Sequence, residues 1–93
     1  MRDLSIDHVP DNIEEKKRIL ACGHLLMRGR VDASLAMSRA IGDWKCKDPH
    51  LGAKKMAIIS LPEVQKLPIT PAIDYLVSAC DGIWDCMTSD EVI

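Results

Sequence analysis

The sequence predicts an α+β fold, because it combines two helix-start signals with several short apolar runs. Residues 11–14 (Asp-Asn-Ile-Glu) and 88–91 (Thr-Ser-Asp-Glu) each place a capping residue three positions before a glutamate, as in a capping box. Residues 75–80 carry no charge and suit a strand that is buried on both faces. We therefore expect helices near both ends of the chain and β-structure between them.

The first helix is expected to begin after Asp11, which would act as its N-cap, and to end near Cys22. Glu14 and Arg18 are four residues apart, which predicts an ion pair along the helix surface. Gly23 is well placed to end the helix, because glycine adopts the left-handed conformation that often follows the last turn.

The centre of the chain is expected to form short strands joined by turns. Residues 25–27 and 30–31 flank a turn at Gly29, and residues 35–37 alternate as in a half-buried strand. A bend or short helical turn is predicted for residues 40–43, a surface loop for 44–56 and a strand for 57–60. Residues 64–69 are expected to form an edge strand, because Pro62 and Pro68 interrupt this stretch.

The composition fits one small globular domain. The 93 residues are 47% hydrophobic and 28% charged, and with 3% aromatic residues and no Phe the core must be mainly aliphatic. The net charge of −2 argues against a nucleic-acid partner, which usually requires a concentrated basic surface. The oligomeric state is left open.

The chain shows no signal peptide and no apolar stretch near the roughly 18 residues that a membrane span needs. None of its four cysteines forms a C-x-x-C pair, and Cys22 and Cys80 lie in apolar settings typical of small buried hydrophobes. We therefore expect no membrane segment and an intracellular location, cytoplasmic or nuclear.

Asp81 is the candidate metal ligand. It follows the apolar run 75–80 directly, and Gly82 would let the chain turn sharply behind it. A carboxylate fixed at the edge of a core suits Mg²⁺ or Mn²⁺, which prefer oxygen donors. An Asp-Gly pair after a strand is also typical of a simple turn, so these residues alone leave both interpretations open.

Three clusters of residues, taken in order, suggest a family. Residues 4–10 read LSIDHVP, residues 35–43 read LAMSRAIGD and residues 78–85 read SACDGIWD. The combination resembles the type 2C metal-dependent serine/threonine protein phosphatases, whose corresponding stretches read S-x-D-H-x-P, L-A-V-S-R-A-x-G-D and A-C-D-G-I-W-D. Residues 62–64 (PEV) also resemble a segment between the second and third of these motifs.

The resemblance implies a fold, a cofactor and an activity. The family fold is an αββα sandwich, two antiparallel sheets flanked by helices, and residues 1–93 would be a partial domain truncated at both ends. A dinuclear Mg²⁺ or Mn²⁺ site in the complete domain would activate a water that attacks the phosphorus of phosphoserine or phosphothreonine. The partners would be phosphoprotein substrates.

The third motif gives the most specific expectation. Asp81 matches a metal ligand of the family, and Gly82 matches a glycine that the backbone requires. Trp84 is expected to fill space under the site, and Asp85 is expected to be structural. No catalytic residue is predicted in this chain, because the general acid, the phosphate-binding arginine and the other metal ligands of the family belong to motifs outside it.

The remaining positions are expected to be structural. Arg39 and Asp43 could form an ion pair or simply belong to a bend. His8 and His24 fall in the stretch that matches the family's flap, which borders the active site, and each is expected to be a structural or surface histidine. Residues 32–33 (Asp-Ala) replace the usual Asn-Gly, which puts a tight turn there in doubt.

Three functional hypotheses follow. The first is that the chain is part of a metal-dependent protein phosphatase and is inactive alone, because Asp81 supplies only one ligand. The second is a non-catalytic truncated paralogue that acts as a binding module. The third is a small α+β domain unrelated to phosphatases.

Overall fold

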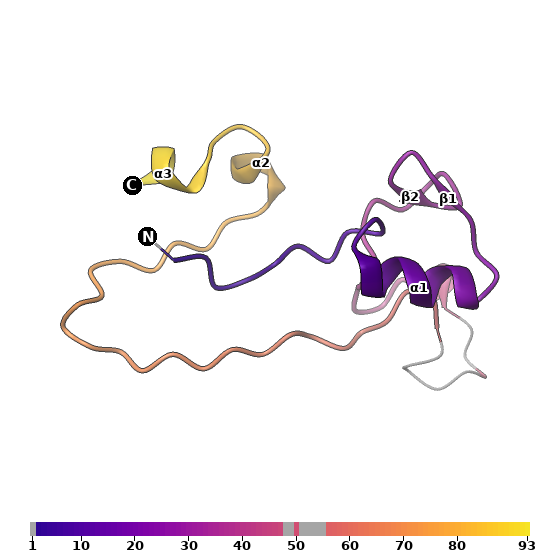
Figure 1. The fold of residues 1–93 in the computed structure, drawn as a ribbon, viewed down its shortest axis with the longest axis horizontal. Helices are drawn as coiled ribbons and strands as arrows, with labels where there is room; N and C mark the ends of the chain where they lie inside the picture. The colour runs from indigo at the N-terminus through magenta and orange to yellow at the C-terminus, as the bar shows by residue number, and fades with distance from the viewer. Residues whose placement is uncertain (1, 48–49, 51–55) are drawn as a thin grey trace. The chain divides into compact units, whose positions relative to one another are not determined.

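The computed structural model describes residues 2–47, 50 and 56–93 (Figure 1). Within them lie one two-stranded antiparallel sheet and helices near both ends, so the predicted α+β class is confirmed. The elements in order are α1 (Ile13–Ala21), β1 (Leu26–Met27), β2 (Arg30–Val31), the 3₁₀ helix η1 (Trp44–Cys46), α2 (Asp81–Trp84) and α3 (Ser89–Val92).

The chain divides into two units. The central unit is Asp7–Glu63, and the terminal unit comprises Met1–Ile6 and Val64–Ile93. The central unit contains α1, the hairpin and η1, and the terminal unit contains α2 and α3. The longest helix of the described residues has nine residues, and none has the length and apolar character needed to cross a membrane.

Helix α1 starts one residue later than predicted and ends as predicted. Asn12, not Asp11, is the N-cap, and its side-chain nitrogen donates to the Asp7 carbonyl (2.6 Å) instead of forming the expected capping box. At the other end Gly23 has a φ of +85°, and its amide donates to the Leu20 carbonyl (3.0 Å). The glycine therefore ends the helix in the left-handed conformation.

The predicted Glu14–Arg18 ion pair is wrong. Lys17 donates to Glu14 (2.9 Å) on the exposed surface, whereas Arg18 donates to Glu15 (2.6 Å). Arg18 is drawn inward because its Nε also donates to the carbonyl of Ala57 (3.1 Å), which an arginine on the solvent side could not reach.

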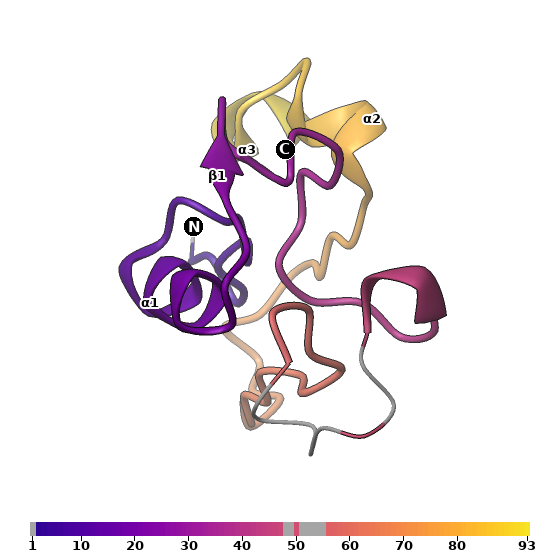
Figure 2. The ribbon, with the colours of Figure 1, turned by 90° about the vertical axis from the view of Figure 1, so that its right-hand side faces the viewer.

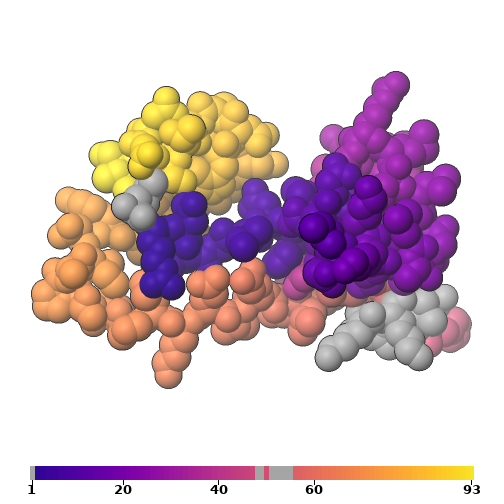
Figure 3. Space-filling model, viewed as in Figure 1, coloured from indigo at the N-terminus to yellow at the C-terminus, as the bar shows by residue number. Residues whose placement is uncertain are grey.

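The hairpin forms where the sequence predicts it, on the surface of the central unit (Figure 3). Leu26 pairs with Val31 and Met27 with Arg30. The two turn residues, at positions 28 and 29, have φ values of +53° and +71°. This is the geometry of the two-residue turns that match the twist of hairpin strands.

A second tight turn follows at residues 32–33, contrary to the doubt raised by their sequence. Asp32 and Ala33 have φ values of +49° and +59°, and the turn is closed by a hydrogen bond from the Val31 amide to the Leu35 carbonyl (2.8 Å). The Asp32 carboxylate secures the turn, because it accepts from the Leu25 amide (3.0 Å). Beyond this bridge, residues 36–37 do not form the predicted strand.

The core of the central unit is aliphatic, as the composition predicts. Ile19, Val31, Ala57 and Ile58 are buried together, and Ile59 is also buried. The side chains that pack against this cluster are partly buried: Cys22, Leu26, Leu35, Ala40 and Cys46. Figure 2 shows α1 and β1 of this unit. The predicted strand at 57–60 is reduced to one parallel bridge between Ile59 and Arg39.

The predicted surface loop at 44–56 is described in part. It contains η1, and the next residue, Lys47, is 9% exposed rather than solvated. The Lys47 ammonium donates to the Ala40 carbonyl and to Ser60 Oγ (2.8 Å). Residues 48–49 and 51–55 of this predicted loop lie outside the described residues.

The predicted strands at 64–69 and 75–80 are not formed. Tyr75 and Leu76 are 78% and 76% exposed, and Cys80 is exposed rather than buried. A strand needs a neighbour that completes its ladder, and the described residues give neither segment one. At the end of the unit, the predicted capping box is confirmed: the Thr88 amide donates to Glu91 (2.8 Å) at the start of α3.

Candidate functional site

Asp81 is the first residue of α2, with Cys80 as the N-cap. Its side chain is exposed, at the point where the apolar segment 75–80 meets the helix. A carboxylate in the first turn of a helix is favourably placed relative to the helix dipole and is accessible to an ion from solvent. That Asp81 binds a metal stays a prediction.

The residues around Asp81 depart from two expectations. Gly82 is helical, and a Cβ added there would meet only the Cys80 sulfur at 3.7 Å, which is ordinary contact. The local backbone therefore does not require a glycine in this structure. Trp84 is 36% exposed, and its indole nitrogen donates to the Ala79 carbonyl (2.7 Å). Trp84 thus fastens α2 to the preceding segment instead of filling a buried space.

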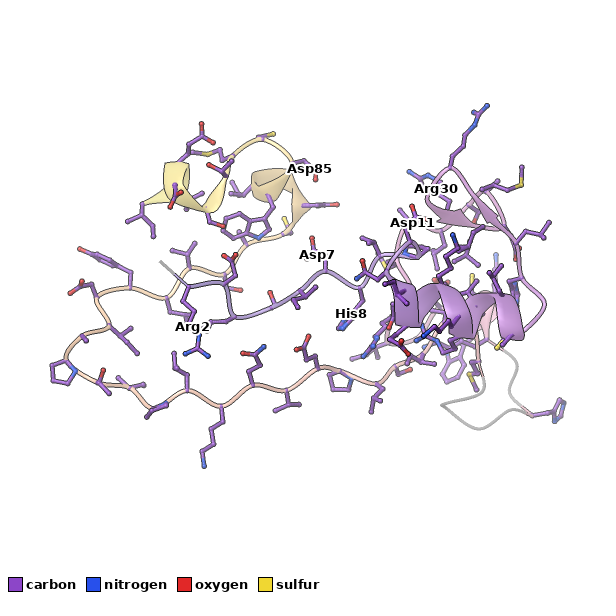
Figure 4. All side chains as sticks on the ribbon, viewed as in Figure 1. Arg2, Asp7, His8, Asp11, Arg30 and Asp85 are labelled. Carbon is purple, nitrogen blue, oxygen red and sulfur yellow. The ribbon has the colours of Figure 1, made fainter. Side chains whose placement is uncertain are left out.

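Asp85 has a backbone role in α2. Its amide donates to the Asp81 carbonyl (2.8 Å), and its side chain is exposed (Figure 4). Among the described residues, no group of three or more His, Cys, Asp or Glu side chains converges on a point that could hold a metal ion. Mg²⁺ requires near-octahedral coordination by oxygen ligands, several of which are usually water, and the described residues do not supply such a ligand set by themselves.

The central unit contains a buried carboxylate that the sequence interpretation missed. Glu15 is only 2% exposed. Its carboxylate accepts hydrogen bonds from Arg18 Nη2 (2.6 Å), from Ser38 Oγ (2.6 Å) and from Arg39 Nε (3.2 Å to each oxygen) and Nη2 (2.5 Å). We call Glu15, Arg18, Ser38 and Arg39 the Glu15 cluster.

The cluster keeps its carboxylate ionised. Burial by itself raises the pKa of Glu15, but the hydrogen bonds from Arg39, Arg18 and Ser38 outweigh that effect and hold the pKa well below its usual range. The same contact raises the pKa of Arg39. Every buried side-chain nitrogen and oxygen in the described residues has a hydrogen-bond partner, so the burial of charge here is fully compensated.

The cluster also joins three segments of the chain. Arg18 Nη2 donates to the Ser38 carbonyl (3.0 Å), and Arg39 Nη1 donates to the Leu61 carbonyl (3.1 Å). Of the two interpretations of Arg39 and Asp43, the bend holds: residues 41–42 form a bend, and Arg39 pairs with Glu15 instead of Asp43. The arginine of the second motif therefore positions the backbone.

One sequence signal could have revealed Glu15. It lies four residues before Ile19, the fully buried residue of α1, so both point to the same face of the helix. A glutamate on the core-facing side of a helix requires buried cationic partners. The spacing to Arg18 supplies the first, and Arg39, 24 residues away, could not be assigned without the fold.

His8 and His24 occupy structural positions, as expected. The His8 imidazole (Figure 4) lies 3.7 Å from the Glu63 carboxylate, and the His8 carbonyl accepts a hydrogen bond from the Ser38 amide (2.9 Å). His24 Nδ1 contacts the Asp32 carboxylate at 2.6 Å. This hydrogen bond is the main cause that lowers the pKa of Asp32.

The comparisons with known proteins agree on one class. A family model, Protein phosphatase 2C, matches residues 1–93. The chain is 48% identical over 92 residues to Protein phosphatase 2C homolog 3 of Schizosaccharomyces pombe, which covers 99% of this chain and 22% of that protein. It is 46% identical over 92 residues to Probable protein phosphatase 2C 60 of Arabidopsis thaliana, covering 98% of this chain and 26% of that protein.

A solved structure shows the same relationship. The crystal structure of a phosphatase from a pathogenic strain of Toxoplasma gondii superimposes with a TM-score of 0.61 at 38% sequence identity. The match covers 64% of this chain and 19% of that chain. The shared class is therefore that of the protein phosphatases.

The chain belongs to the protein phosphatase 2C family, a family of metal-dependent enzymes. The resemblance seen in its three motifs is confirmed, and the hypothesis of an unrelated α+β domain is wrong. The chain spans 22% and 26% of the length of the two curated relatives named above.

Proposed function

We propose that the chain forms part of a phosphatase domain that hydrolyses phosphoserine and phosphothreonine in proteins with Mg²⁺ or Mn²⁺. The observation that carries this proposal is the family match along all 93 residues, which includes the D-G-I-W-D motif at Asp81. The chain would be a partial domain, and its short elements would be completed by the sheets and helices of an αββα sandwich.

In this proposal Asp81 is one ligand of a dinuclear metal site. The side chain is exposed at the first residue of α2, so a cation can approach its oxygens. The ions, when bound, would activate water and offset the charge of the phosphoryl group. The described residues provide no cluster of three potential ligands, so other parts of the domain must supply the rest.

The isolated 93-residue chain is therefore expected to be inactive. Purified chain, incubated with a phosphothreonine peptide and excess Mn²⁺, should release no more phosphate than buffer with Mn²⁺. Turnover that disappears in Asp81→Asn would contradict this expectation, because it would show that Asp81 and its surroundings suffice for a site.

A chimeric domain tests the proposed activity directly. Residues 1–93 would replace the matching segment of the Schizosaccharomyces pombe relative, which is 48% identical over 92 residues. The chimera should hydrolyse the phosphopeptide only with Mg²⁺ or Mn²⁺, and Asp81→Asn should lower kcat/KM by about 100-fold or more because a ligand of the charge-stabilising metal is lost.

The control is Asp74→Asn, which removes an exposed carboxylate from the same unit seven residues earlier. This variant should retain the activity of the parent chimera. A folded chimera in which Asp81→Asn is as active as Asp74→Asn would refute the role of Asp81, and a folded but inactive parent chimera would refute the phosphatase proposal for this segment.

A non-catalytic binding module is the second candidate. One observation favours it: the central unit has its own aliphatic core and a fully hydrogen-bonded buried ion cluster. A module should melt cooperatively as a 93-residue chain and give dispersed amide resonances. If the isolated chain shows neither a cooperative melt nor dispersed resonances, and the chimera is active, the chain is better explained as part of an enzyme domain.

A further inference from the structure

The pair Asp81–Gly82 differs in its chemistry from the other acidic positions of the chain. It is the only place in the 93 residues where an aspartate or asparagine precedes a glycine. Because glycine has no Cβ, its backbone nitrogen can approach the carboxyl group of the residue before it. Attack at that carboxyl requires an exposed side chain, an amide nitrogen without a hydrogen-bond acceptor, and a backbone that can leave its folded conformation.

The carboxyl and the amide both meet these requirements. The Asp81 side chain is exposed. The Gly82 amide lies in the first turn of α2, where a helix offers its amides no acceptor, and it donates to no group in the part of the chain that the structure describes. A Cβ at position 82 would meet only the Cys80 sulfur, at 3.7 Å, so an alanine would fit there as well.

Helix α2 restrains this backbone only weakly. Ring closure requires the Asp81 backbone to rotate out of its helical conformation, so the helix must open first. Two hydrogen bonds oppose the opening: the Asp85 amide donates to the Asp81 carbonyl (2.8 Å), and the Trp84 indole nitrogen donates to the Ala79 carbonyl (2.7 Å). A helix of four residues is marginal in water, and exposed, weakly packed segments open often. The helix therefore slows the attack without preventing it.

We propose that Asp81–Gly82 is a site of spontaneous isomerisation. The Gly82 nitrogen bonds to the side-chain carboxyl carbon of Asp81, and the carboxyl hydroxyl leaves with the amide proton as water. Water then opens the resulting succinimide at either carbonyl, which returns aspartate or gives isoaspartate. The first step releases the water that the second step takes up, so the reaction needs no oxidant, reductant or enzyme.

Isomerisation changes both the backbone and the carboxylate of residue 81. In isoaspartate the main chain runs through Cβ and Cγ, and the former backbone carbonyl carbon bears the free carboxylate. The oxygen that accepts from the Asp85 amide thus leaves the helical backbone, and the carboxylate that the proposed function assigns to a metal ion is displaced. The product has the chemistry that isoaspartyl methyltransferases recognise, enzymes that transfer a methyl group from S-adenosylmethionine to such a carboxylate.

Peptide mapping of the aged chain tests the proposal. The full 93-residue chain would be kept in neutral buffer for several weeks and cleaved with trypsin, which leaves residues 67–93 as one fragment. Electron-transfer fragmentation in a mass spectrometer distinguishes isoaspartate from aspartate at each position. Isoaspartate should form at residue 81 at a rate within about tenfold of that in a peptide of residues 79–85. Asp74 and Asp85, which are exposed in the same fragment, should isomerise far more slowly.

Two variants separate the chemistry of the pair from general ageing. Gly82→Ala adds a Cβ that contacts only Cys80 and favours the helix, so isoaspartate at residue 81 should fall to the level at Asp85. Asp81→Asn presents a neutral amide that is attacked more readily, so it should give the same products faster, with loss of ammonia.

Three results would overturn the proposal. The first is a residue 81 that stays unchanged or that α2 protects by much more than tenfold relative to the peptide. The second is isomerisation of Asp74 or Asp85 as fast as that of Asp81. The third is a folded Gly82→Ala chain that isomerises as fast as the unsubstituted one, or a folded Asp81→Asn chain that does not react. Should a variant fail to fold, the first two comparisons decide the proposal by themselves.

Discussion

Glu15 illustrates how one side chain can determine the arrangement of three segments. It lies on α1 beside the core, and its donors come from its own helix and from residues 38–39. Its two arginine partners also donate to carbonyls of a third segment, residues 57–61. Burying a carboxylate without partners would cost several kcal/mol, and removing one partner from a buried ion pair typically costs 3–5 kcal/mol. The cluster is therefore stable only when all of its members are in place.

Glu15→Gln should lower the free energy of unfolding by about 3 kcal/mol, because it leaves two arginines without a charged acceptor. Urea titration followed by circular dichroism would measure the change. Glu14→Gln is the matched control, because Glu14 lies next to Glu15 on α1 and makes one exposed ion pair with Lys17. This substitution should change the free energy of unfolding by less than about 1 kcal/mol. Equal effects of the two substitutions would contradict a buried role for Glu15.

The pH dependence gives an independent check on Glu15. Because its pKa is lowered in the folded state, its contribution to stability is fully present above the unfolded pKa, near 4.3, and is lost as the pH falls further. The unsubstituted chain should therefore lose more stability between pH 5 and pH 3 than Glu15→Gln does. A carboxyl whose pKa is raised by burial alone would have the opposite effect, because its contribution to stability would increase as the pH falls.

At the scale of elements, the tight turn after β2 is formed at a conformational cost. Ala33 has a φ of +59°, in a region that costs an L-residue with a Cβ roughly 1–2 kcal/mol. The Asp32 carboxylate forms hydrogen bonds with the Leu25 amide and with His24, and these help to hold the turn. Side-chain hydrogen bonds thus replace the glycine that such a turn usually contains.

Ala33→Gly should therefore raise the free energy of unfolding by about 0.5–1 kcal/mol, since relief of the left-handed strain exceeds the added entropy of the unfolded chain. Thermal melting would show a higher Tm. Ala36→Gly, at an exposed position without a positive φ, should leave stability unchanged or lower it. A lower Tm for Ala33→Gly than for Ala36→Gly would show that the turn is not strained.

The sequence predicted well those elements that depend on neighbouring residues, and predicted poorly those features that depend on contacts between distant residues. Gly23, Gly29 and the box at residues 88–91 each act through neighbours a few positions away, so α1, the hairpin and α3 could be placed from sequence. The segment 75–80 could not, because an apolar run becomes a strand only when another strand lies beside it. The Glu15 cluster was missed for the same reason: two of the three residues that donate to Glu15, Ser38 and Arg39, are more than 20 residues away from it.

The candidate metal site shows the same limit. The motif around Asp81 identified the residue by family resemblance, and the family itself is confirmed. The surroundings of Asp81 differ from those predicted. Gly82 is helical, and the Trp84 indole donates a hydrogen bond to the Ala79 carbonyl instead of lying beneath a site. Ligand sets of this kind combine residues that are distant in sequence, so a single motif specifies one ligand and leaves the others open.

For the molecule as a whole, stability should be uneven along the chain. Native-state exchange follows local packing and hydrogen bonding. The amides of Ser38 and Ala40 donate to backbone carbonyls inside the central unit, at 2.9 and 3.0 Å. Leu76 and Val77 are 76% and 44% exposed, in a segment without a strand partner among the described residues. The central unit should therefore open far less often than residues 75–80.

Amide hydrogen exchange of the 93-residue chain at pH 6.5 would measure this difference. We expect protection factors of about 100 or more at Ser38 and Ala40, and values within about tenfold of unprotected peptide at Leu76 and Val77. Strong protection at both sets would mean that residues 75–80 pair with a strand in solution, for instance in a second copy of the chain. That result would contradict the prediction that residues 75–80 are unpaired. It would favour the hypothesis of a self-contained binding module over that of a partial phosphatase domain.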